Sequence, residues 1–272
     1  MTCLMQNSSL PYVPCDSIEE QAYRLASISL SEMESVKLMD RTDTKFLLPR
    51  RRIPALLHAL LKNYRILEVD GHRLSAYETL YFDTPDLRSY HDHQCGRLNR
   101  YKVRQRHYIQ SKLLFTEVKH KTNKGRTIKQ RIRGHVVHAP EKVPTRLAEL
   151  DDVSRLFVHQ LTAHRLPDLH PVLWVGYQRI TLVSCTSVER ITLDLGLSFQ
   201  AGERTKDFAN LAIAEVKQDS RQHSEFISLM KRNGVRSGSL SKYCLGMVSL
   251  HGAIKQNRFK PQLHHLQKIL QQ

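Results

Sequence analysis

Most of the positive charge of this sequence lies in one window, between positions 97 and 133. The window holds 13 Lys or Arg residues and a single acid, Glu117, so it carries +12 of the formal net charge of +16 for all 272 residues. Guanidinium groups bind phosphate oxygens in pairs, and lysine adds a mobile point charge. Charge of one sign at this density repels itself unless a multivalent anion neutralises it. The window therefore predicts a polyanion-binding site, and phosphate fits its mixture of Arg and Lys.

The basic residues of this window alternate with apolar ones, as the side chains of β-strands do. Val103, Val118 and Ile128 occupy the intervening positions, and a period of two places alternate side chains on opposite faces of a strand. The string Asn123-Lys-Gly125 predicts a hairpin turn. We therefore expect consecutive antiparallel strands. Their charged faces are Lys102, Arg104 and Arg106, then Glu117, Lys119 and Lys121, then Lys129, Arg131 and Arg133.

The same alternation recurs outside the basic window. The shared faces there are Arg41, Asp43 and Lys45, then Tyr177, Arg179 and Thr181, then Arg190, Thr192 and Asp194, and finally Glu215 and Lys217. Many strands with one apolar and one charged face favour closure into a barrel whose lumen is the charged side. Amphipathic patterns predict helices over 49–61, 145–161 and 224–233. The expected fold is α+β, a closed antiparallel β-barrel with flanking helices.

Carboxylates share these basic faces and are candidate metal ligands. In triphosphate chemistry, Mg²⁺ or Mn²⁺ held by one or two carboxylates bridges phosphate oxygens. Asp43 and Asp194 are expected instead to pair with neighbouring arginines. The string His91-Asp-His-Gln-Cys95 does not have the ligand spacing of a zinc site. Tyr81-Phe-Asp-Thr-Pro85 is expected to end a strand in a turn, with Asp83 in a structural role.

Nine strings in order resemble the motifs of a known family, the VTC-type polyphosphate polymerase domain. That family belongs to the triphosphate tunnel metalloenzymes, relatives of the CYTH phosphatases, and the resemblance runs from about residue 35 to residue 248. The strings are Arg41-Thr-Asp-Thr-Lys-Phe46, Tyr81-Phe-Asp-Thr-Pro85, Lys102-Val-Arg-Gln-Arg-His-Tyr108, Phe115-Thr-Glu-Val-Lys-His-Lys121, Lys129-Gln-Arg131, Tyr177-Gln-Arg-Ile-Thr181, Arg190-Ile-Thr-Leu-Asp194, Ala214-Glu-Val-Lys217 and Ser241-Lys-Tyr243.

The resemblance implies an eight-stranded antiparallel tunnel in which ATP donates its γ-phosphoryl group to a growing inorganic polyphosphate chain. The implied cofactor is a divalent metal, Mn²⁺ or Mg²⁺, bound by Glu215, with Glu117 as a second candidate. The expected catalytic residues are Arg104, Arg106, Lys129 and Arg179. The expected phosphate-binding residues are Lys45, Lys102, Lys119, Lys121, Arg131, Arg190, Lys217, Ser241 and Lys242.

The expected organisation is an N-terminal extension over 1–34, a catalytic tunnel domain over 35–250 and a C-terminal tail over 251–272 that is either helical or frayed. Five cysteines at irregular spacing favour a reducing compartment over a disulfide framework. The sequence shows neither a secretory leader nor a run of about 18 apolar residues. We therefore expect a cytoplasmic protein without an integral membrane segment, whose membrane contact, if any, is peripheral.

Two rival functions stay open at this point. CYTH-like triphosphatases, which transfer the phosphoryl group to water, tend to begin with a Glu-x-Glu-x-Lys strand. The matching face here is Arg41-x-Asp43-x-Lys45, in which a base replaces one acid. Non-catalytic nucleic-acid binding suits the charge, but the basic strands carry few of the interleaved aromatics of a single-strand stacking platform. The expected partners are thus ATP and inorganic polyphosphate, without nucleic acid.

Overall fold

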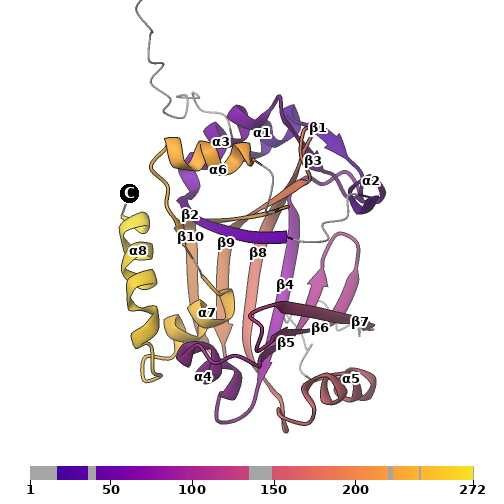
Figure 1. Ribbon diagram of the computed structural model, residues 1–272, viewed down its shortest axis with the longest axis vertical. Coiled ribbons are helices and arrows are strands. Elements are labelled where there is room, and N and C mark those ends of the chain that lie inside the picture. Colours follow the sequence, from indigo (N-terminus) through magenta and orange to yellow (C-terminus); the bar gives the residue numbers. More distant parts are fainter. Residues whose placement is uncertain (1–16, 36–40, 135–148, 220–222, 239, 272) are drawn as a thin grey trace, which may run out of the picture.

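One strongly curved β-sheet organises the computed structural model (Figure 1). The structure describes residues 17–35, 41–134, 149–219, 223–238 and 240–271. Within these residues the sheet has 11 strands. In chain order they are β1 (Ala26–Ile28), β2 (Arg41–Pro49), β3 (Tyr64–Leu67), β4 (Ser75–Asp83), β5 (Arg100–Tyr108), β6 (Leu113–Lys121), β7 (Thr127–Gly134), β8 (His170–Ser184), β9 (Glu189–Ala201), β10 (Arg204–Asp219) and β11 (Ser237–Gly238).

The strands follow the order β11-β2-β10-β9-β8-β4-β5-β6-β7, and each neighbouring pair on this path is antiparallel. Off the path, β3 pairs with β8, and β1 pairs with β3 in parallel. The antiparallel arrangement predicted for the basic strands is confirmed, because β5 pairs with β6 and β6 with β7. Gly125, with φ of 72°, lies in the predicted turn between β6 and β7, in the left-handed region that favours glycine.

The predicted closed, eight-stranded barrel is not what the described residues form. β7 and β11 stand at the two ends of the strand order, and no pairing joins them within the described part of the chain. The sheet instead curls, so that β2 lies in front of β8, β9 and β10 in Figure 1. Alternation along a strand predicts which side chains share a face, whereas closure depends on the stagger between strands, which alternation does not report.

Eight α-helices and two short 3₁₀ turns flank the sheet in the described residues. They are α1 (Ile18–Arg24), α2 (Leu30–Ser35), η1 (Arg50–Arg52), α3 (Ile53–Leu60), α4 (Arg88–Cys95), α5 (Asp152–Thr162), α6 (Glu225–Arg232), α7 (Lys242–Leu250), η2 (Asn257–Phe259) and α8 (Lys260–Leu270). The helices predicted over 49–61 and 224–233 are confirmed as η1 with α3 and as α6. The third predicted helix begins only at Asp152, and residues 145–148 of that prediction lie outside the described residues.

Helices α1, α3, α5 and α6 cover the outer, apolar face of the curved sheet. α1, α3 and α6 form one core with β2 and β8–β10, where Leu56 and Ile180 are fully buried. α5 covers a second outer core around Val103. α7 and α8 pack instead on the inner face at one end of the cavity, where Ile213 alternates in phase with Glu215. Complete burial of one such aliphatic side chain contributes about 2 kcal/mol. Because these alternate residues fill the outer cores, the charged residues between them point to the inner face of the sheet.

Asp83 ends β4 and organises the turn that follows, as predicted. Its Oδ1 accepts hydrogen bonds from the backbone N–H groups of Thr84 (2.9 Å) and Ser89 (2.8 Å), and its Oδ2 accepts one from that of Tyr90 (2.9 Å). The hydroxyl of Tyr243 also donates to Oδ2. Asp83 therefore joins the start of α4 to α7, which is a structural role.

None of the helices in the described residues is both long enough and apolar enough to cross a membrane.

Candidate active site in a basic cavity

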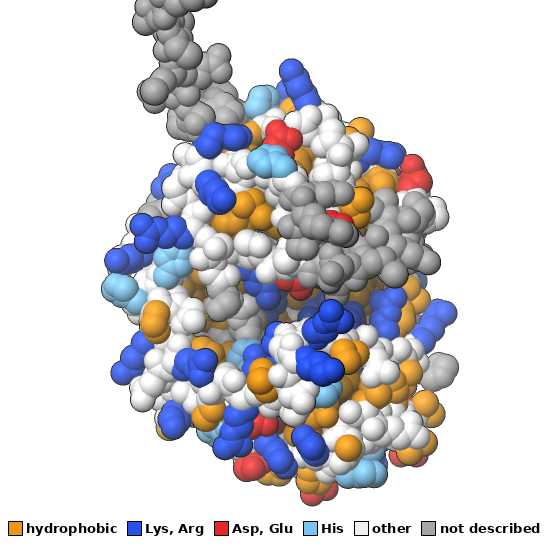
Figure 2. Space-filling model, viewed as in Figure 1, with side chains coloured by type: hydrophobic (Ala, Val, Ile, Leu, Met, Phe, Trp, Pro, Cys, Tyr) orange, Lys and Arg blue, Asp and Glu red, His pale blue; other side chains and the backbone are white. Residues whose placement is uncertain are grey.

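The inner face of the curved sheet lines a cavity of about 1420 Å³. In Figure 2, Lys and Arg side chains are spread over the viewed face and reach into a hollow near its centre. The cavity brings together every predicted site residue except Glu117. These are Lys45, Lys102, Arg104, Arg106, Lys119, Lys121, Lys129, Arg131, Arg179, Arg190, Glu215, Lys217, Ser241 and Lys242. Their predicted convergence on one cavity is thus confirmed, while their individual roles stay predictions.

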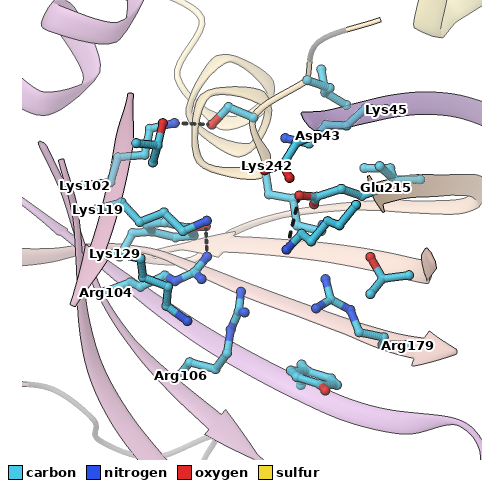
Figure 3. Close-up of a pocket in the computed structure, with 18 of the residues that line it drawn as sticks. Asp43, Lys45, Lys102, Arg104, Arg106, Lys119, Lys129, Arg179, Glu215 and Lys242 are labelled. Carbon is cyan, nitrogen blue, oxygen red and sulfur yellow. Dashed lines mark hydrogen bonds and ion pairs between the residues drawn. The ribbon is translucent and has the colours of Figure 1, made fainter. Parts of the chain in front are cut away.

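Two walls face each other across the cavity (Figure 3). The first wall consists of the inward side chains of β5, β6 and β7, and includes Arg104 and Lys129. The second wall consists of the inward side chains of β2, β8, β9 and β10 together with Lys242 of α7. Among the described residues that line the cavity, the only acids are Asp43 and Glu215, and both lie on the second wall. The two walls therefore differ in charge: every charged residue that lines the first wall is a cation, whereas the second wall carries both signs.

Glu117 lies beneath the first wall and is 0% exposed. Arg104 donates to Glu117 Oε2 from Nε at 2.7 Å and from Nη2 at 2.6 Å, and Lys129 pairs with Oε1. Burial alone would raise the pKa of Glu117, but Arg104, Arg106 and Lys129 lower it well below its ordinary value. Glu117 is therefore ionised and fixes the positions of two predicted catalytic cations.

Asp194 has the corresponding place beneath the second wall and is also 0% exposed. Arg179 donates to Asp194 from Nε (2.5 Å) and from Nη2 (2.8 Å), so the predicted pairing of Asp194 with an arginine is confirmed. Lys242, the first residue of α7, pairs with Oδ2. The hydroxyl of Ser241 caps α7 by accepting from the N–H of Cys244 at 3.3 Å, which fixes the helix start that carries Lys242.

Glu215 of β10 and Asp43 of β2 are the two carboxylates that line the cavity in the described residues, and they lie on neighbouring strands. Glu215 lies 3.5 Å from Lys217 Nζ, and Lys217 is the β10 residue that pairs in register with Asp43 of β2. Burial would raise the pKa of Glu215, but Lys217 and Lys45 are the main cations that lower it to about 2, so the carboxylate is ionised at neutral pH.

The number of ligands decides what kind of metal ion this site fits. No group of three or more His, Cys, Asp or Glu side chains within the described ranges could hold a metal ion. Mg²⁺ commonly uses one or two carboxylates together with substrate phosphates. Two hard oxygen donors on neighbouring strands therefore fit a Mg²⁺ or Mn²⁺ that binds together with a phosphate ligand.

The lysines of the first wall are poorly stabilised as cations when no anion is bound. Burial lowers the pKa of Lys129 to about 8, although Glu117 partly opposes the shift. The charge of Arg104, followed by burial, lowers the pKa of Lys119 well below its ordinary value. Burial likewise lowers the pKa of Lys102. A phosphate chain in the cavity would stabilise the charged form of each lysine, so the wall is complementary to an anion.

Several tyrosines pack against the cations in one part of the cavity. These tyrosines were not among the predicted site residues. Tyr77 stacks on Tyr177, with ring centroids 5.3 Å apart and planes 6° apart, and Tyr108 packs against Tyr77 at 4.9 Å. The guanidinium carbon of Arg179 lies 5.1 Å from the ring centre of Tyr77, and that of Arg106 lies 5.7 Å from it. The sequence pattern could have identified two of these tyrosines, because Tyr108 and Tyr177 share the alternation of the predicted site residues.

Arg100, Arg126 and His93 also line the cavity and were not predicted as site residues. The two arginines belong to the basic window, and Arg100 shares the face of Lys102 by alternation. His93 lies in α4 with the rest of the string expected not to bind zinc. Its imidazole faces the cavity only because α4 packs against β5, a tertiary contact that the sequence pattern does not report.

These features define a class of protein in which a curved antiparallel sheet surrounds a cation-lined cavity. The family model of the VTC domain matches residues 40–251. The chain therefore belongs to the VTC domain family, and the resemblance inferred from the nine strings is confirmed.

Comparison of the fold with solved structures gives more distant likenesses. A putative adenylate cyclase from Bacillus halodurans is 12% identical, with a TM-score of 0.46, over 75% of this chain and 96% of the other. A putative adenylate cyclase from Vibrio parahaemolyticus is 12% identical, with a TM-score of 0.44, over 77% and 99%. A putative adenylyl cyclase from Hippeastrum, described as having a dominant triphosphatase activity, is 13% identical, with a TM-score of 0.44, over 78% and 96%. No curated protein matches the sequence.

Proposed function

We propose that the protein is a metal-dependent polyphosphate polymerase that transfers the γ-phosphoryl group of ATP to an inorganic polyphosphate chain. The observation that carries the proposal is the amount of positive charge in the cavity. Fourteen Lys or Arg side chains line it, against two carboxylates. A single triphosphate with its metal ion needs far fewer cations, whereas a chain of phosphates beside a nucleotide would use charge along both walls.

The metal ion would bind at Glu215 on the second wall. Asp43, which was expected from the sequence to pair with an arginine, would be the second carboxylate ligand, because it lines the same cavity on the neighbouring strand. When bound, it supplies positive charge that neutralises phosphate oxygens as the phosphoryl group is transferred. Glu117 was a second candidate ligand, but both of its oxygens pair with cations of the first wall and it does not line the cavity. We therefore assign Glu117 to the positioning of Arg104 and Lys129.

The residues of the chain bind and orient the two substrates. A terminal oxygen of the polyphosphate acceptor attacks the γ-phosphorus of ATP, the new P–O bond forms as the bond to the β-phosphate oxygen breaks, and ADP leaves. Arg104, Arg106 and Arg179 neutralise the non-bridging oxygens from both sides of the cavity. Because positioning and electrostatics carry phosphoryl transfer, this reaction needs no protein nucleophile.

Incubation of the purified protein with ATP and Mn²⁺, followed by gel electrophoresis of the products, tests the proposal. The expected product is long-chain polyphosphate together with ADP, and an exopolyphosphatase should degrade the polymer. Glu215→Gln should make little polymer. Formation of ADP and orthophosphate alone would contradict the proposal and favour a triphosphatase, in which water replaces the acceptor.

A further inference from the structure

One end of the cavity differs in chemistry from its cationic middle. There α7, η2 and α8 contribute apolar and aromatic side chains, among them Leu245, Val248, Phe259 and Leu263. Polyphosphate has no apolar surface, so this lining is not complementary to a phosphate chain. Phe259 and α8 also lie beyond residue 251, where the match to the family model ends. In Figure 1, α8 stands beside β10 and β2, the strands that carry Glu215 and Lys45.

Phe259 is a half-buried ring whose orientation is fixed by its neighbours. Tyr90 meets it edge to face, with centroids 6.2 Å apart and planes 64° apart. His93 lies at the same centroid distance, 6.2 Å, with planes 32° apart. Tyr90 is itself anchored, because its hydroxyl donates to the backbone carbonyl of Lys255 at 2.8 Å. The cavity therefore has at this end an aromatic ring that is held in place before any ligand binds.

His93 provides a neutral hydrogen-bond donor beside this ring. Its Nδ1 accepts from Nε of Arg100 at 3.2 Å, so the ring proton resides on Nε2. Burial first, and then the charges of Lys102 and Arg100, lower the pKa of His93 to about 2. The imidazole is therefore uncharged at neutral pH and does not add to the attraction for phosphate.

Gln262 provides a hydrogen-bond acceptor at the same end. In the amide orientation that satisfies its partners, Nε2 donates to the carbonyls of Phe259 and Arg258 at 3.1 Å each. Its Oε1 is then left to accept a hydrogen bond. A purine base has apolar faces, a ring-nitrogen acceptor and, in adenine, an amino donor. The aromatic ring, one donor and one acceptor match these features of the base.

The opposite end of the cavity has a different lining. Its lining includes the aliphatic side chains of Leu30, Met33 and Val69. Tyr77, one of the aromatic residues at this end, is already stacked on Tyr177 and lies beneath Arg179. Tyr108, Phe115, Gln110 and Ser111 also line this end, but the rings there pack on one another or lie beneath a guanidinium group, as Phe115 does beneath Arg131. The two ends therefore differ in how their aromatic rings are already engaged.

We propose that the α8 end of the cavity binds the base of a purine nucleoside triphosphate, which stacks on Phe259, and that the triphosphate extends from there between the two walls. Lys102 would meet the first phosphates, since it lies at this end and its Nζ donates to Ser241 Oγ at 2.8 Å. The base site rests on the proposed function, which supplies the nucleotide, but it is tested by binding alone.

The test compares two probes, ATP and inorganic tripolyphosphate, whose dissociation constants are measured by calorimetry without added metal. Phe259→Ala should weaken ATP binding roughly tenfold, in keeping with the loss of one base–aromatic stack, and change tripolyphosphate binding less than twofold. Met33→Ala, a cavity-lining variant at the opposite end, should change neither. Equal weakening of both probes by Phe259→Ala, or unchanged ATP binding, would overturn the proposal, as would a selective loss of ATP binding in Met33→Ala.

Phe259→Leu is a second variant that controls for misfolding of Phe259→Ala. Leucine keeps apolar volume against Tyr90 but removes the aromatic ring. The same selective loss of ATP binding is expected, with an unchanged thermal midpoint. The base site and the proposed function fail in different ways. Absence of polymer, with a selective loss of ATP binding in Phe259→Ala, would refute the polymerase and support the base site. Polymer synthesis with an unchanged KM for ATP in Phe259→Ala would support the polymerase and refute the base site.

Discussion

Arg179 holds Asp194 with two hydrogen bonds, from Nε at 2.5 Å and from Nη2 at 2.8 Å. On the facing wall, Arg104 holds Glu117 through the same two kinds of nitrogen. Each carboxylate is 0% exposed, and each also pairs with one lysine. The two walls are thus built alike: a buried carboxylate fixes an arginine and a lysine that face the cavity. Cations held in this way need little reorganisation when phosphate binds.

Removal of the buried charge beneath the second wall should destabilise the protein. Asp194→Asn leaves Arg179 and Lys242 without their counterion, and loss of one partner from a buried ion pair costs about 3 to 5 kcal/mol. Denaturant unfolding measures the change, with Asp207→Asn on β10 as a matched control at an exposed position. Saturating tripolyphosphate should restore part of the lost stability, because it supplies negative charge to the same cations. Equal stabilities of the two variants would contradict this role for Asp194.

Glu215 and Glu117 should differ in their effect on metal dependence. Glu215→Gln removes a proposed ligand, so polymer synthesis should fall roughly 10²- to 10³-fold and require more Mn²⁺. Glu117→Gln weakens the support of Arg104 and Lys129, so turnover should fall while the Mn²⁺ concentration for half-maximal activity stays the same. Titration of Mn²⁺ with both variants makes the comparison. A shifted Mn²⁺ requirement in Glu117→Gln would contradict this assignment and indicate that Glu117 is a metal ligand.

Phosphate binding should weaken as the pH rises through about 8. The pKa of Lys129 is lowered to about 8, chiefly by burial and further by Arg104, against the opposing effect of Glu117. Above that pH the free protein loses the ammonium charge, while bound phosphate favours the charged form, so binding is accompanied by proton uptake. Calorimetry of tripolyphosphate binding in buffers of different ionisation enthalpy measures this uptake.

Lys129→Arg serves as the control for this pH effect, since guanidinium stays charged throughout the range. Its affinity for tripolyphosphate should depend less on pH between about 7 and 9 than that of the unsubstituted protein. Indistinguishable pH profiles for the two proteins would show that Lys129 does not titrate in the binding range.

Loss of one cation from the cavity lining should cost far more activity than loss of a cation outside the lining. Arg106→Ala removes a guanidinium that is 7% exposed and lines the cavity, and turnover should fall roughly 10²- to 10³-fold. Arg133→Ala provides the matched control, because Arg133 is exposed on β7, outside the cavity lining. Steady-state kinetics with ATP compares the two variants. Similar losses in both would indicate a general charge effect and contradict a specific site.

The alternation of charged and apolar residues predicted the strands and the inner face because a strand has a fixed period. It placed Arg104, Arg179 and Glu215 on one cavity although up to 111 positions separate them in the sequence. The alternation did not predict how deeply each side chain of that face is buried. Glu117 alternates with the lining residue Lys119, yet it lies underneath, because Arg104 and Lys129 fold over it.

Contacts between distant elements explain the rest of what the sequence did not predict. Lys242 reaches Asp194 because α7 begins at the cavity, and no local pattern reports where a helix start docks. Phe259 lines the cavity from a segment expected only as a helical or frayed tail. The expected barrel closure was not confirmed for a similar reason, since closure depends on whether the strands at the two ends of the order, β7 and β11, pair with each other.

A crystal structure of the protein with Mn²⁺ and a short polyphosphate tests the central claim most directly. The account predicts phosphates along the cavity, in contact with Arg104 and Lys129 on one wall and Arg179 on the other, with the metal ion at Glu215. A phosphate chain bound to the outer surface, with neither wall in contact with it, would contradict the account.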